Sequence, residues 1–489
     1  MRRALTGALG AAVAATLVTT ATPAAAIDDV NTTQLRKAVT VNGILKHARA
    51  LQVIANQNDG TRASGLPGYE ASVDYVTEQL RRSGYSVKKQ AFTFSFFRSL
   101  SEPTLSQVSP TPTDYETDIY SYSGGGEVTG VVVPANDNVV PATEEPSSTA
   151  GCTPGSFDPA PAEDAIALVQ RGGCDFAVKV DNAAAAGYDA VIIFNEGNPG
   201  RTELSIGTLG DPKDVPVVGL SYADGVALIE QAAAGPVTLS VSTEVETDPN
   251  RTTWNVIADL SPKDLKKVKN KDQVVVVGAH LDSVPEGPGI NDNGSGSAGI
   301  LAIAQEMADL KLTKKLARPV RFAFWGAEES GLLGAEHYVA SLSDQQRSKI
   351  YANLNFDMIG SPNYVRFVYD GDGSSGGPVG PPGSDVIETV FTDYFESQGL
   401  ASEPTDFDGR SDYGPFIEAG IPAGGLFSGA EGVKTPEQAA VYGGTAGEWY
   451  DPCYHQACDD ITNLNVKALN ELGDAAAHAT LTLTKSRSG

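Results

Sequence analysis

The sequence is poor in positive charge. Its 489 residues contain 35 Lys and Arg against 61 Asp and Glu, which gives a formal net charge of −26 at pH 7. Nucleic-acid binding depends on Lys and Arg clusters that neutralise phosphates, so this composition argues against a nucleic-acid partner. The single basic run, residues 263–271, has acidic neighbours in Asp264 and Asp272 and is interpreted as a solvated surface loop.

Long hydrophobic runs are missing after the first residues. Arg2 and Arg3 precede an apolar, alanine-rich run over residues 4–22, and small residues follow at 24–26. This order is typical of a secretory signal peptide cleaved after Ala26. A membrane anchor is the alternative, but the run is laced with Thr, Gly and Ala and lacks a strongly hydrophobic span of about 20 residues. We therefore expect a secreted, extracellular protein that is free of the membrane once the signal is cleaved.

Cysteine is scarce, with four residues that allow three pairings. Cys152 and Cys174 are close in sequence, as are Cys453 and Cys458, so local pairing is favoured. Neither pair has the CxxC spacing of a cysteine-based zinc site. Disulfides are the default in an exported protein, and we expect them here.

Residues 274–277 are a continuous apolar run, as expected of a strand buried on both faces, and residues 320–325 are predicted to be the next buried strand. Between them, residues 297–310 have the apolar periodicity of an amphipathic helix. Alternation of this kind predicts an α/β fold with a mixed, largely parallel central sheet flanked by helices.

The composition changes at about residue 104, where Pro, Ser, Thr and Gly become frequent between short strand candidates. We interpret residues 105–244 as a small β-rich domain inserted into a larger one. The expected organisation is a signal peptide over 1–26, then a main domain formed by 27–104 and 245–489.

Side chains that can bind metals follow the predicted strands. They are His280 and Asp292 after the first strand, Glu328 and Glu329 after the second, Asp357 after a third apolar segment, and His455 between the two late cysteines. Each has an ordinary explanation by itself; Asp292, for example, could simply cap a helix. Together they offer two of the chain's five histidines and several carboxylates. One tetrahedral zinc cannot use as many as five of these side chains as ligands, whereas two metals about 3.5–4 Å apart with a shared carboxylate can.

These residues resemble the site of the zinc-dependent M28 aminopeptidases. The motifs are His280-x-Asp282, Asn291-Asp292-Asn293-Gly294, Glu328-Glu329, Asp357 and His455, and residues 450–459 are close to the secreted Streptomyces-type members. The resemblance covers about residues 33–97 and 254 to the end. The inserted section, with Arg171-Gly172-Gly173-Cys174 and Ala186-Gly187-Tyr188, resembles a protease-associated (PA) domain.

The resemblance implies two zinc ions. One zinc takes His280 and Asp357, the other takes Glu329 and His455, and Asp292 bridges them. Calcium is a further candidate cofactor, to which the sequence assigns no ligands.

The resemblance also implies the catalytic roles. Glu328 is the general base that takes a proton from a water between the two metals and passes it to the departing amine. Asp282 orients the ring of His280; a turn residue is the alternative. Tyr454 donates a hydrogen bond to the developing oxyanion, and the short loop between Cys453 and Cys458 holds it in position.

Peptides with a free N-terminus are the substrates that the resemblance implies, with the α-amine held near Glu328 and Asp357. Arg410 is a candidate for orienting the substrate, although a structural salt bridge explains it nearly as well. Met358 and Phe427 could line a pocket for a large apolar first residue such as Leu, or could be ordinary core residues. A monomer is expected.

The sequence can be compared with what several alternative functions would require. A binding protein that had lost catalysis should lack the base or some ligands, yet Glu328 and all five ligands are present. A calcium loop around Asp292 fails the EF-hand pattern, because Gly289 and Ile300 occupy its first and twelfth positions. The complete ligand set makes a one-zinc cyclase less favourable, and a two-zinc carboxypeptidase remains the nearest alternative.

Overall fold

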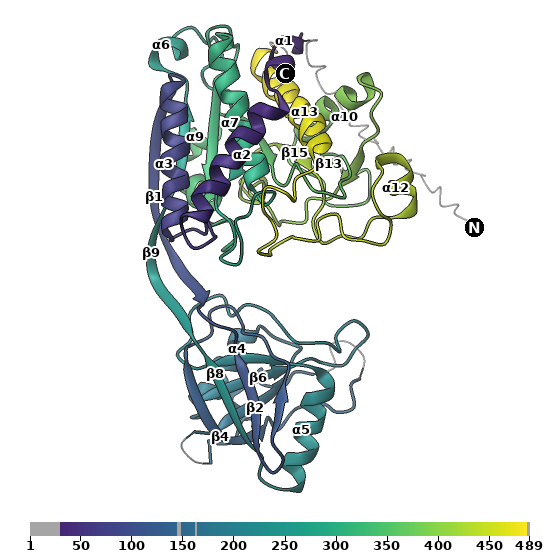
Figure 1. The fold of residues 1–489 in the computed structure, drawn as a ribbon. Coiled ribbons are helices and arrows are strands. Elements are labelled where there is room, and N and C mark those ends of the chain that lie inside the picture. The colour runs from purple at the N-terminus through teal and green to yellow at the C-terminus, as the bar shows by residue number, and fades with distance from the viewer. Residues whose placement is uncertain (1–29, 144–147, 162–163, 487–489) are drawn as a thin grey trace, which may run out of the picture.

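The computed structural model describes residues 30–143, 148–161 and 164–486. The signal peptide predicted at residues 1–26 lies outside them. Figure 1 shows two bodies joined by a pair of long strands, β1 (Ser86–Ser99) and β9 (Val245–Asp259), which run antiparallel to each other. Among the helices of the described residues, none combines the length and hydropathy that a bilayer crossing requires.

The larger body is built on an eight-stranded sheet in the order β1-β9-β11-β10-β12-β15-β13-β14. The strands not yet bounded are β10 (Val274–His280), β11 (Val320–Trp325), β12 (Ile350–Phe356), β13 (Phe367–Tyr369), β14 (Glu403–Thr405) and β15 (Ala423–Phe427). The central strands β11, β10, β12 and β15 are parallel, whereas β1, β9 and β13 join the sheet antiparallel. The predicted mixed, largely parallel sheet is confirmed.

Helices cover both faces of this sheet. One face packs against α1 (Thr33–Ala38), α2 (Val41–Asn56), α3 (Pro67–Arg82), α7 (Gly294–Asp309), α10 (Ser384–Ser397) and α13 (Val466–Lys485), and the other against α8 (Leu333–Ala340) and α11 (Gly414–Glu418). Alternate residues of a strand point to opposite faces. In β10, Val275 and Val277 accordingly enter the first core and Val276 enters the second, so all three are buried. The continuous apolar run in the sequence reflects this two-sided burial.

Helix α7 begins at Gly294, earlier than the predicted start at residue 297. The cause is a cap: the side chain of Asn293 accepts a hydrogen bond from the backbone N–H of Gly296 at 2.8 Å. Because Asn293 satisfies this otherwise unpaired N–H group, the glycine-containing turn 294–296 becomes helical. Asp292 therefore precedes the cap and its carboxylate is free for another role.

The smaller body has a seven-stranded sheet in the order β3-β2-β8-β4-β5-β6-β7. Its elements are β2 (Thr104–Ser109), β3 (Thr113–Tyr115), β4 (Gly126–Pro134), β5 (Ile166–Gln170), β6 (Ala190–Phe194), β7 (Val217–Leu220), β8 (Thr238–Thr243), α4 (Phe176–Ala185) and α5 (Tyr222–Ala234). Helices α4 and α5 pack on opposite faces of the parallel strands β5 and β6. This body therefore has its own core.

The four cysteines form two disulfides. Cys152 pairs with Cys174 in the smaller body, and Cys453 pairs with Cys458 in the larger one. The predicted local pairing is confirmed.

Candidate two-metal active site

Residues from five places in the chain meet at one end of the larger sheet. His280 ends β10, Glu328 and Glu329 follow β11, Asp357 follows β12, Asp292 precedes α7, and His455 comes from the Cys453–Cys458 loop. Parallel strands end at the same edge, so the chain brings these side chains together although the outermost are 175 positions apart (455 − 280). This is the edge where α/β sheets bind ligands.

Asp292 lies between the two histidines. Its Oδ1 is 3.2 Å from His280 Nε2 and its Oδ2 is 3.3 Å from His455 Nε2. His280 Nε2 is also 3.2 Å from Asp357 Oδ1, and His455 Nε2 is 3.1 Å from Glu329 Oε2. Two ligand atoms that each lie about 2.0–2.1 Å from a tetrahedral zinc are separated by about 3.3 Å. The distances from His280 to Asp292 and Asp357, and from His455 to Asp292 and Glu329, therefore fit one zinc ion in each group, with Asp292 shared.

Burial and crowding set the electrostatics of this cluster. Burial raises the pKa of Glu328 well above its usual range. Burial, together with the charge of Asp292, raises the pKa of Glu329 to about 7. Burial lowers the pKa of His455, but hydrogen bonds to Asp292 and Glu329 outweigh it and raise that pKa to about 11. Carboxylates held so close in a low-dielectric site favour a bound cation.

Three non-glycine residues at the site have a left-handed backbone. Ala327 precedes Glu328 with φ 53°, Met358 follows Asp357 with φ 50°, and His455 itself has φ 58°. Such conformations cost about 1–3 kcal/mol each and persist where surrounding structure enforces them, often at functional sites. Here they turn the chain sharply at the predicted base Glu328 and at two of the predicted ligands, Asp357 and His455.

Asp282 links His280 to Glu328. His280 Nδ1 is 3.2 Å from the backbone oxygen of Asp282 and 3.6 Å from its Oδ1. The same Oδ1 accepts a hydrogen bond from the backbone N–H of Glu328 at 3.3 Å. Asp282 thus contacts both the imidazole and the segment that carries Glu328.

Two aspartates outside the predicted set hold the Asp292 loop. Asp459 accepts hydrogen bonds from the backbone N–H groups of Asn291 and Asp292, each at 2.9 Å, and Asp451 accepts one from the Asn291 side chain at 2.6 Å. Asn463 donates to both carboxylates. Asp451 and Asp459 flank the Cys453–Cys458 loop, so this network ties His455 to Asp292. Both lie in the run that resembles the family, which was the available sequence signal.

Arg62 is a second residue that the sequence did not single out. Its guanidinium is fully buried and donates to the backbone oxygens of Leu281, Pro288 and Gly289. These oxygens belong to the loop between the ligands His280 and Asp292. Within the described part of the chain, Arg62 has no carboxylate at salt-bridge distance, and burial lowers its pKa to about 10. Nothing in the local sequence marks this arginine, because its partners are backbone atoms more than 200 positions away.

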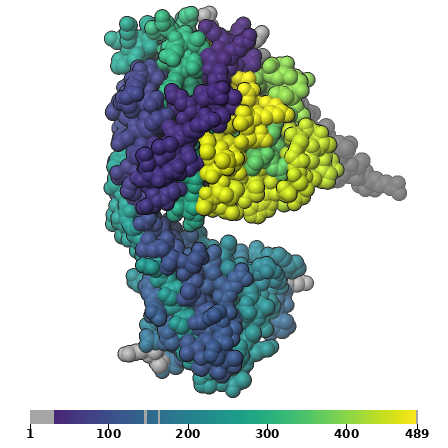
Figure 2. Space-filling view, viewed as in Figure 1, coloured from purple at the N-terminus to yellow at the C-terminus, as the bar shows by residue number. Residues whose placement is uncertain are grey.

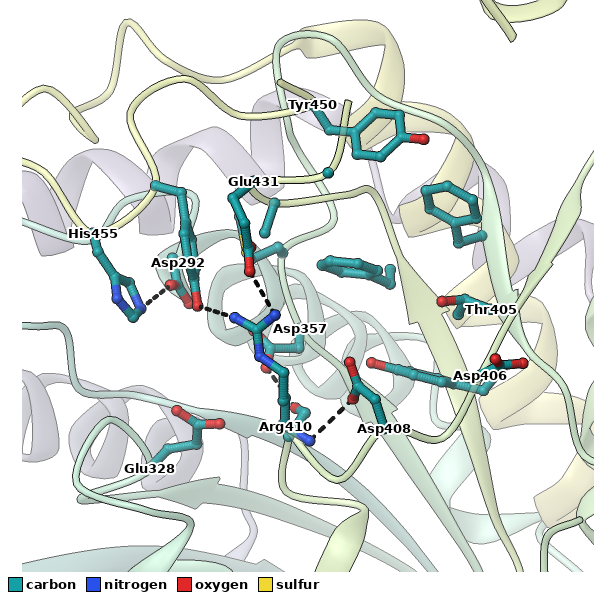
Figure 3. Close-up of a pocket in the computed structure, with 18 of the residues that line it drawn as sticks. Asp292, Glu328, Asp357, Thr405, Asp406, Asp408, Arg410, Glu431, Tyr450 and His455 are labelled. Carbon is teal, nitrogen blue, oxygen red and sulfur yellow. Dashed lines mark hydrogen bonds and ion pairs between the residues drawn. The ribbon is translucent and has the colours of Figure 1, made fainter. Parts of the chain in front are cut away.

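A cavity of about 320 Å³ opens beside the predicted metal ligands (Figure 3). Glu328, Glu329, Asp357, Asp292 and His455 line it, together with the predicted substrate residues Met358, Phe427, Arg410 and Tyr454. Aromatic rings of Phe367, Tyr369 and Tyr450 form further parts of its wall. His280 and Asp282 are buried behind it and do not line it.

Arg410 crosses the mouth of this cavity. Figure 3 shows its guanidinium beside Glu431, to which Nη1 donates at 2.6 Å. Its Nη2 donates to the hydroxyl of Tyr454 at 3.2 Å, and the Tyr454 ring stacks on His455 with centroids 3.8 Å apart. Arg410 therefore forms the ion pair that the alternative interpretation expected and also lines the cavity, and its role in orienting the substrate stays a prediction.

Another acidic group, Asp370, Asp372 and Glu388, lies apart from this cluster. Its carboxylates accept hydrogen bonds from the backbone N–H groups of Gly371 and Ser374. We assign no ion to it, and calcium stays a prediction without ligands.

Sequence comparison identifies two regions. Residues 255–480 match the model of peptidase family M28, and residues 128–228 match the PA domain. An aminopeptidase of Pseudomonas aeruginosa is 46% identical over 460 residues, covering 92% of this chain and 82% of that protein. Leucine aminopeptidase 2 of Trichophyton equinum is 39% identical over 458 residues, covering 93% and 86%.

Solved structures agree over nearly the whole chain. The aminopeptidase from Aneurinibacillus sp. strain AM-1 has a TM-score of 0.70 and 28% identity, covering 93% of this chain and 96% of that one. A zinc aminopeptidase from Bacillus subtilis has a TM-score of 0.63 and 27% identity, covering 91% and 95%. The predicted resemblance is confirmed: the chain belongs to peptidase family M28 and carries a PA domain.

Proposed function

We infer that this M28 chain is a zinc-dependent aminopeptidase, and we propose that it binds two zinc ions. His280 and Asp357 hold one ion, Glu329 and His455 hold the other, and Asp292 is shared. The observation that carries this proposal is the position of Asp292, whose two oxygens face the two imidazoles at 3.2 and 3.3 Å. A carboxylate with one oxygen for each of two neighbouring metals is the usual bridging arrangement.

Zinc at these ligands supplies polarisation of the scissile carbonyl and a lowered pKa for the attacking water. Glu328 is the general base in this proposal. Its carboxylate lines the cavity, and burial raises its pKa. A carboxylate whose pKa lies above its ordinary value can accept the proton of water and then release it to the departing amine.

Tyr454 is proposed as the hydrogen-bond donor to the oxyanion. Burial raises the pKa of its hydroxyl above the ordinary value, which keeps the phenol protonated. Because Arg410 donates to the Tyr454 oxygen, the phenolic proton is left to point elsewhere. Donors fixed in advance at a water-poor site stabilise developing negative charge.

The free α-amine of the substrate is bound by carboxylates. Glu328, Asp357, Asp408 and Glu431 line the cavity, and Arg410, whose charge is already paired with Glu431, is its only lining cation other than histidine among the described residues. This surface favours an ammonium group and disfavours the free carboxylate that a carboxypeptidase must bind. Peptides with a free N-terminus are therefore the proposed substrates.

The first side chain of the substrate lies against Met358, Phe427 and the neighbouring aromatic rings. Met358 is 3% exposed and Phe427 is half-buried, and their apolar surfaces face the cavity. Burying a large apolar side chain is worth about 1.5–3 kcal/mol. We propose a preference for residues such as Leu, which the activity named for the Trichophyton relative supports.

We also propose that the protein is secreted and acts as a monomer. Secretion is supported by the two disulfides, which persist in oxidising compartments. The proposed boundaries are 27–104 and 245–489 for the peptidase domain and 105–244 for the PA domain. They place the seven-stranded sheet in one unit, apart from one residue at the start of β2.

Hydrolysis of Leu-p-nitroanilide and N-acetyl-Leu-p-nitroanilide by the purified protein tests the proposal. We expect cleavage of the free-amine substrate alone, its loss after chelation, and its recovery with two zinc ions per chain by elemental analysis. No cleavage by folded, zinc-loaded protein across several N-terminal residues would falsify the aminopeptidase assignment. Recovery with a single zinc ion would leave the peptidase standing but remove the two-metal site.

A further inference from the structure

The PA domain is attached at the end of the peptidase sheet that carries the metal cluster. Strand β9 runs from the PA domain into the peptidase sheet and pairs antiparallel with β11. In that pairing Phe324, near the end of β11, lies opposite Val256, so β11 and its parallel neighbours β10 and β12 point toward the end from which β9 enters the sheet. Their ends carry the predicted zinc ligands, and Figure 2 shows the surface hollowed between the two bodies at this level.

A groove of about 440 Å³ lies at this junction. We call it the joint groove; Phe92 and Phe94 of β1, Ser330 and His337 of the peptidase body, and Tyr122 and Asp211 of the PA domain line it. Both domains therefore contribute to one surface. The groove is separate from the cavity that holds Met358 and Phe427, because the two share no lining residue.

The joint groove is continuous with the catalytic segment. Glu328 and Glu329 line the cavity, and Ser330, the next residue, lines the groove. The cavity and the groove are therefore lined by successive residues of the chain, 328–329 and 330.

The wall of the groove that the PA domain forms is held in place. The Tyr122 hydroxyl donates to the backbone oxygen of Ser95 in β1 at 3.2 Å, and Tyr122 has a left-handed φ of 70°. The backbone N–H of Lys213 donates to the backbone oxygen of Tyr122 at 2.9 Å, which ties the two PA loops together. On the opposite wall, the Phe92 ring stacks on His337 with centroids 5.1 Å apart. A shape held in this way can bind a chain at a low cost in conformational entropy.

We propose that the joint groove binds the part of the peptide substrate that follows the scissile bond. This inference rests on the proposed function, because it assigns the rest of the chain that enters the same active site. The aromatic walls accept apolar side chains, and the exposed acids Asp211 and Glu336 favour basic ones. The enzyme therefore selects peptides of several residues with apolar or basic residues after the first.

The test compares kcat/KM for Leu-p-nitroanilide with that for peptides of two to eight residues that begin with Leu and carry either Lys or Glu after it. The double variant Asp211→Arg/Glu336→Arg reverses two exposed charges of the groove. Its matched control, Glu230→Arg/Glu396→Arg, reverses one exposed acid on α5 and one on α10 and so makes the same change in net charge.

In the wild type we expect kcat/KM to rise with length and to favour Lys-containing peptides. In the groove variant that preference should fall or reverse by about tenfold, with Leu-p-nitroanilide unchanged within twofold and the control unchanged throughout. Tyr122→Ala, which removes part of the wall, should flatten the length dependence. Equal rates for all lengths in the wild type, or equal changes in short and long substrates, would overturn the groove. Absence of Leu-p-nitroanilide cleavage would instead sink the proposed function.

Discussion

The two sheets of this molecule use their strand ends differently. In the peptidase sheet, β10, β11 and β12 are followed by imidazole and carboxylate groups that converge on one point. In the PA sheet, β5 ends in Gln170 and β6 is followed by Asn195. Gln170 donates to the backbone oxygens of Val139 and Glu196, and Asn195 to that of Glu203. Similar strand ends therefore hold local loops in one domain and an active site in the other, because side-chain chemistry decides the use of a fold.

The same contrast applies to charge. Glu328 is buried among other carboxylates, which together with burial raise its pKa. Glu196 occupies a comparable place after β6, but it pairs with Arg201 at 2.7 Å. The ion pair joins Glu196 to another residue of its own loop, whereas an acid among other acids is available to bind cations or move protons.

Replacing each of these two glutamates with glutamine should give the largest difference in kcat between a change in the peptidase domain and a change in the PA domain. Glu328→Gln removes the proposed base without changing volume, and we expect kcat for Leu-p-nitroanilide to fall by about 10³-fold with zinc content unchanged. Glu196→Gln should leave kcat within twofold. Comparable losses in both variants, or full activity of Glu328→Gln, would remove Glu328 from the mechanism.

The two disulfides should separate stability from activity. Cys152→Ala/Cys174→Ala opens a link across 22 positions in the PA domain and should lower unfolding stability by about 3 kcal/mol, measured by chemical denaturation, with little change in kcat. Cys453→Ala/Cys458→Ala opens a five-position link around Tyr454 and His455. We expect that variant to lose about tenfold or more in kcat/KM, since 1 Å of displacement at a catalytic group is costly. An active enzyme without the second disulfide would show that the Asp451–Asp459 network suffices.

Two fully buried arginines provide a matched pair within the peptidase domain. Arg62 and Arg318 both donate to backbone oxygens, but only Arg62 holds the loop between His280 and Asp292. Arg62→Met should weaken zinc binding by about 10–100-fold, the range for residues that support metal ligands, with partial recovery in Arg62→Lys. Arg318→Met should lower stability and leave zinc affinity intact, as measured by competition with a chelating dye. Equal zinc affinities would reduce Arg62 to a packing role.

The smallest expected effects are changes of unfolding stability with pH, one from a residue in each domain. Burial lowers the pKa of His47 on α2 to about 4 and the pKa of Lys179 on α4 to about 8. Between the lowered pKa and the ordinary pKa of each group, the unfolded chain binds the proton and the folded chain does not. His47 therefore makes stability rise from about pH 4 to 6.5, and Lys179 from about pH 8 to 10.5.

Chemical denaturation of the wild type, His47→Gln and Lys179→Met over a range of pH measures these contributions to stability. Wild-type stability relative to His47→Gln should increase across the acid window, by at most about 3 kcal/mol for a pKa lowered from 6.5 to about 4. Relative to Lys179→Met it should increase by a similar amount across the alkaline one. A difference that is constant with pH in either pair would show that the group titrates normally in the folded protein.

Much of this molecule is readable from its sequence. The strands at residues 274–277 and 320–325 were predictable because strands buried on both faces are mostly apolar. The predicted ligands were identifiable as a set because imidazole and carboxylate groups in that number and order leave few other functions. Local cysteine spacing likewise indicated both disulfides, and the family followed from the same motifs.

Tertiary structure alone decided how the site is supported and how it is reached. Arg62 and Asp459 act on backbone groups of the His280–Asp292 loop, and such contacts leave no pattern in the side-chain sequence. The junction of Tyr122 with β1 depends on the direction of β9 through the sheet, which fixes the end from which the PA domain extends. Sequence determined the chemical groups, because these are local properties of residues. Their convergence, their supports and the groove beside them follow from strand order and direction, which are properties of the whole fold.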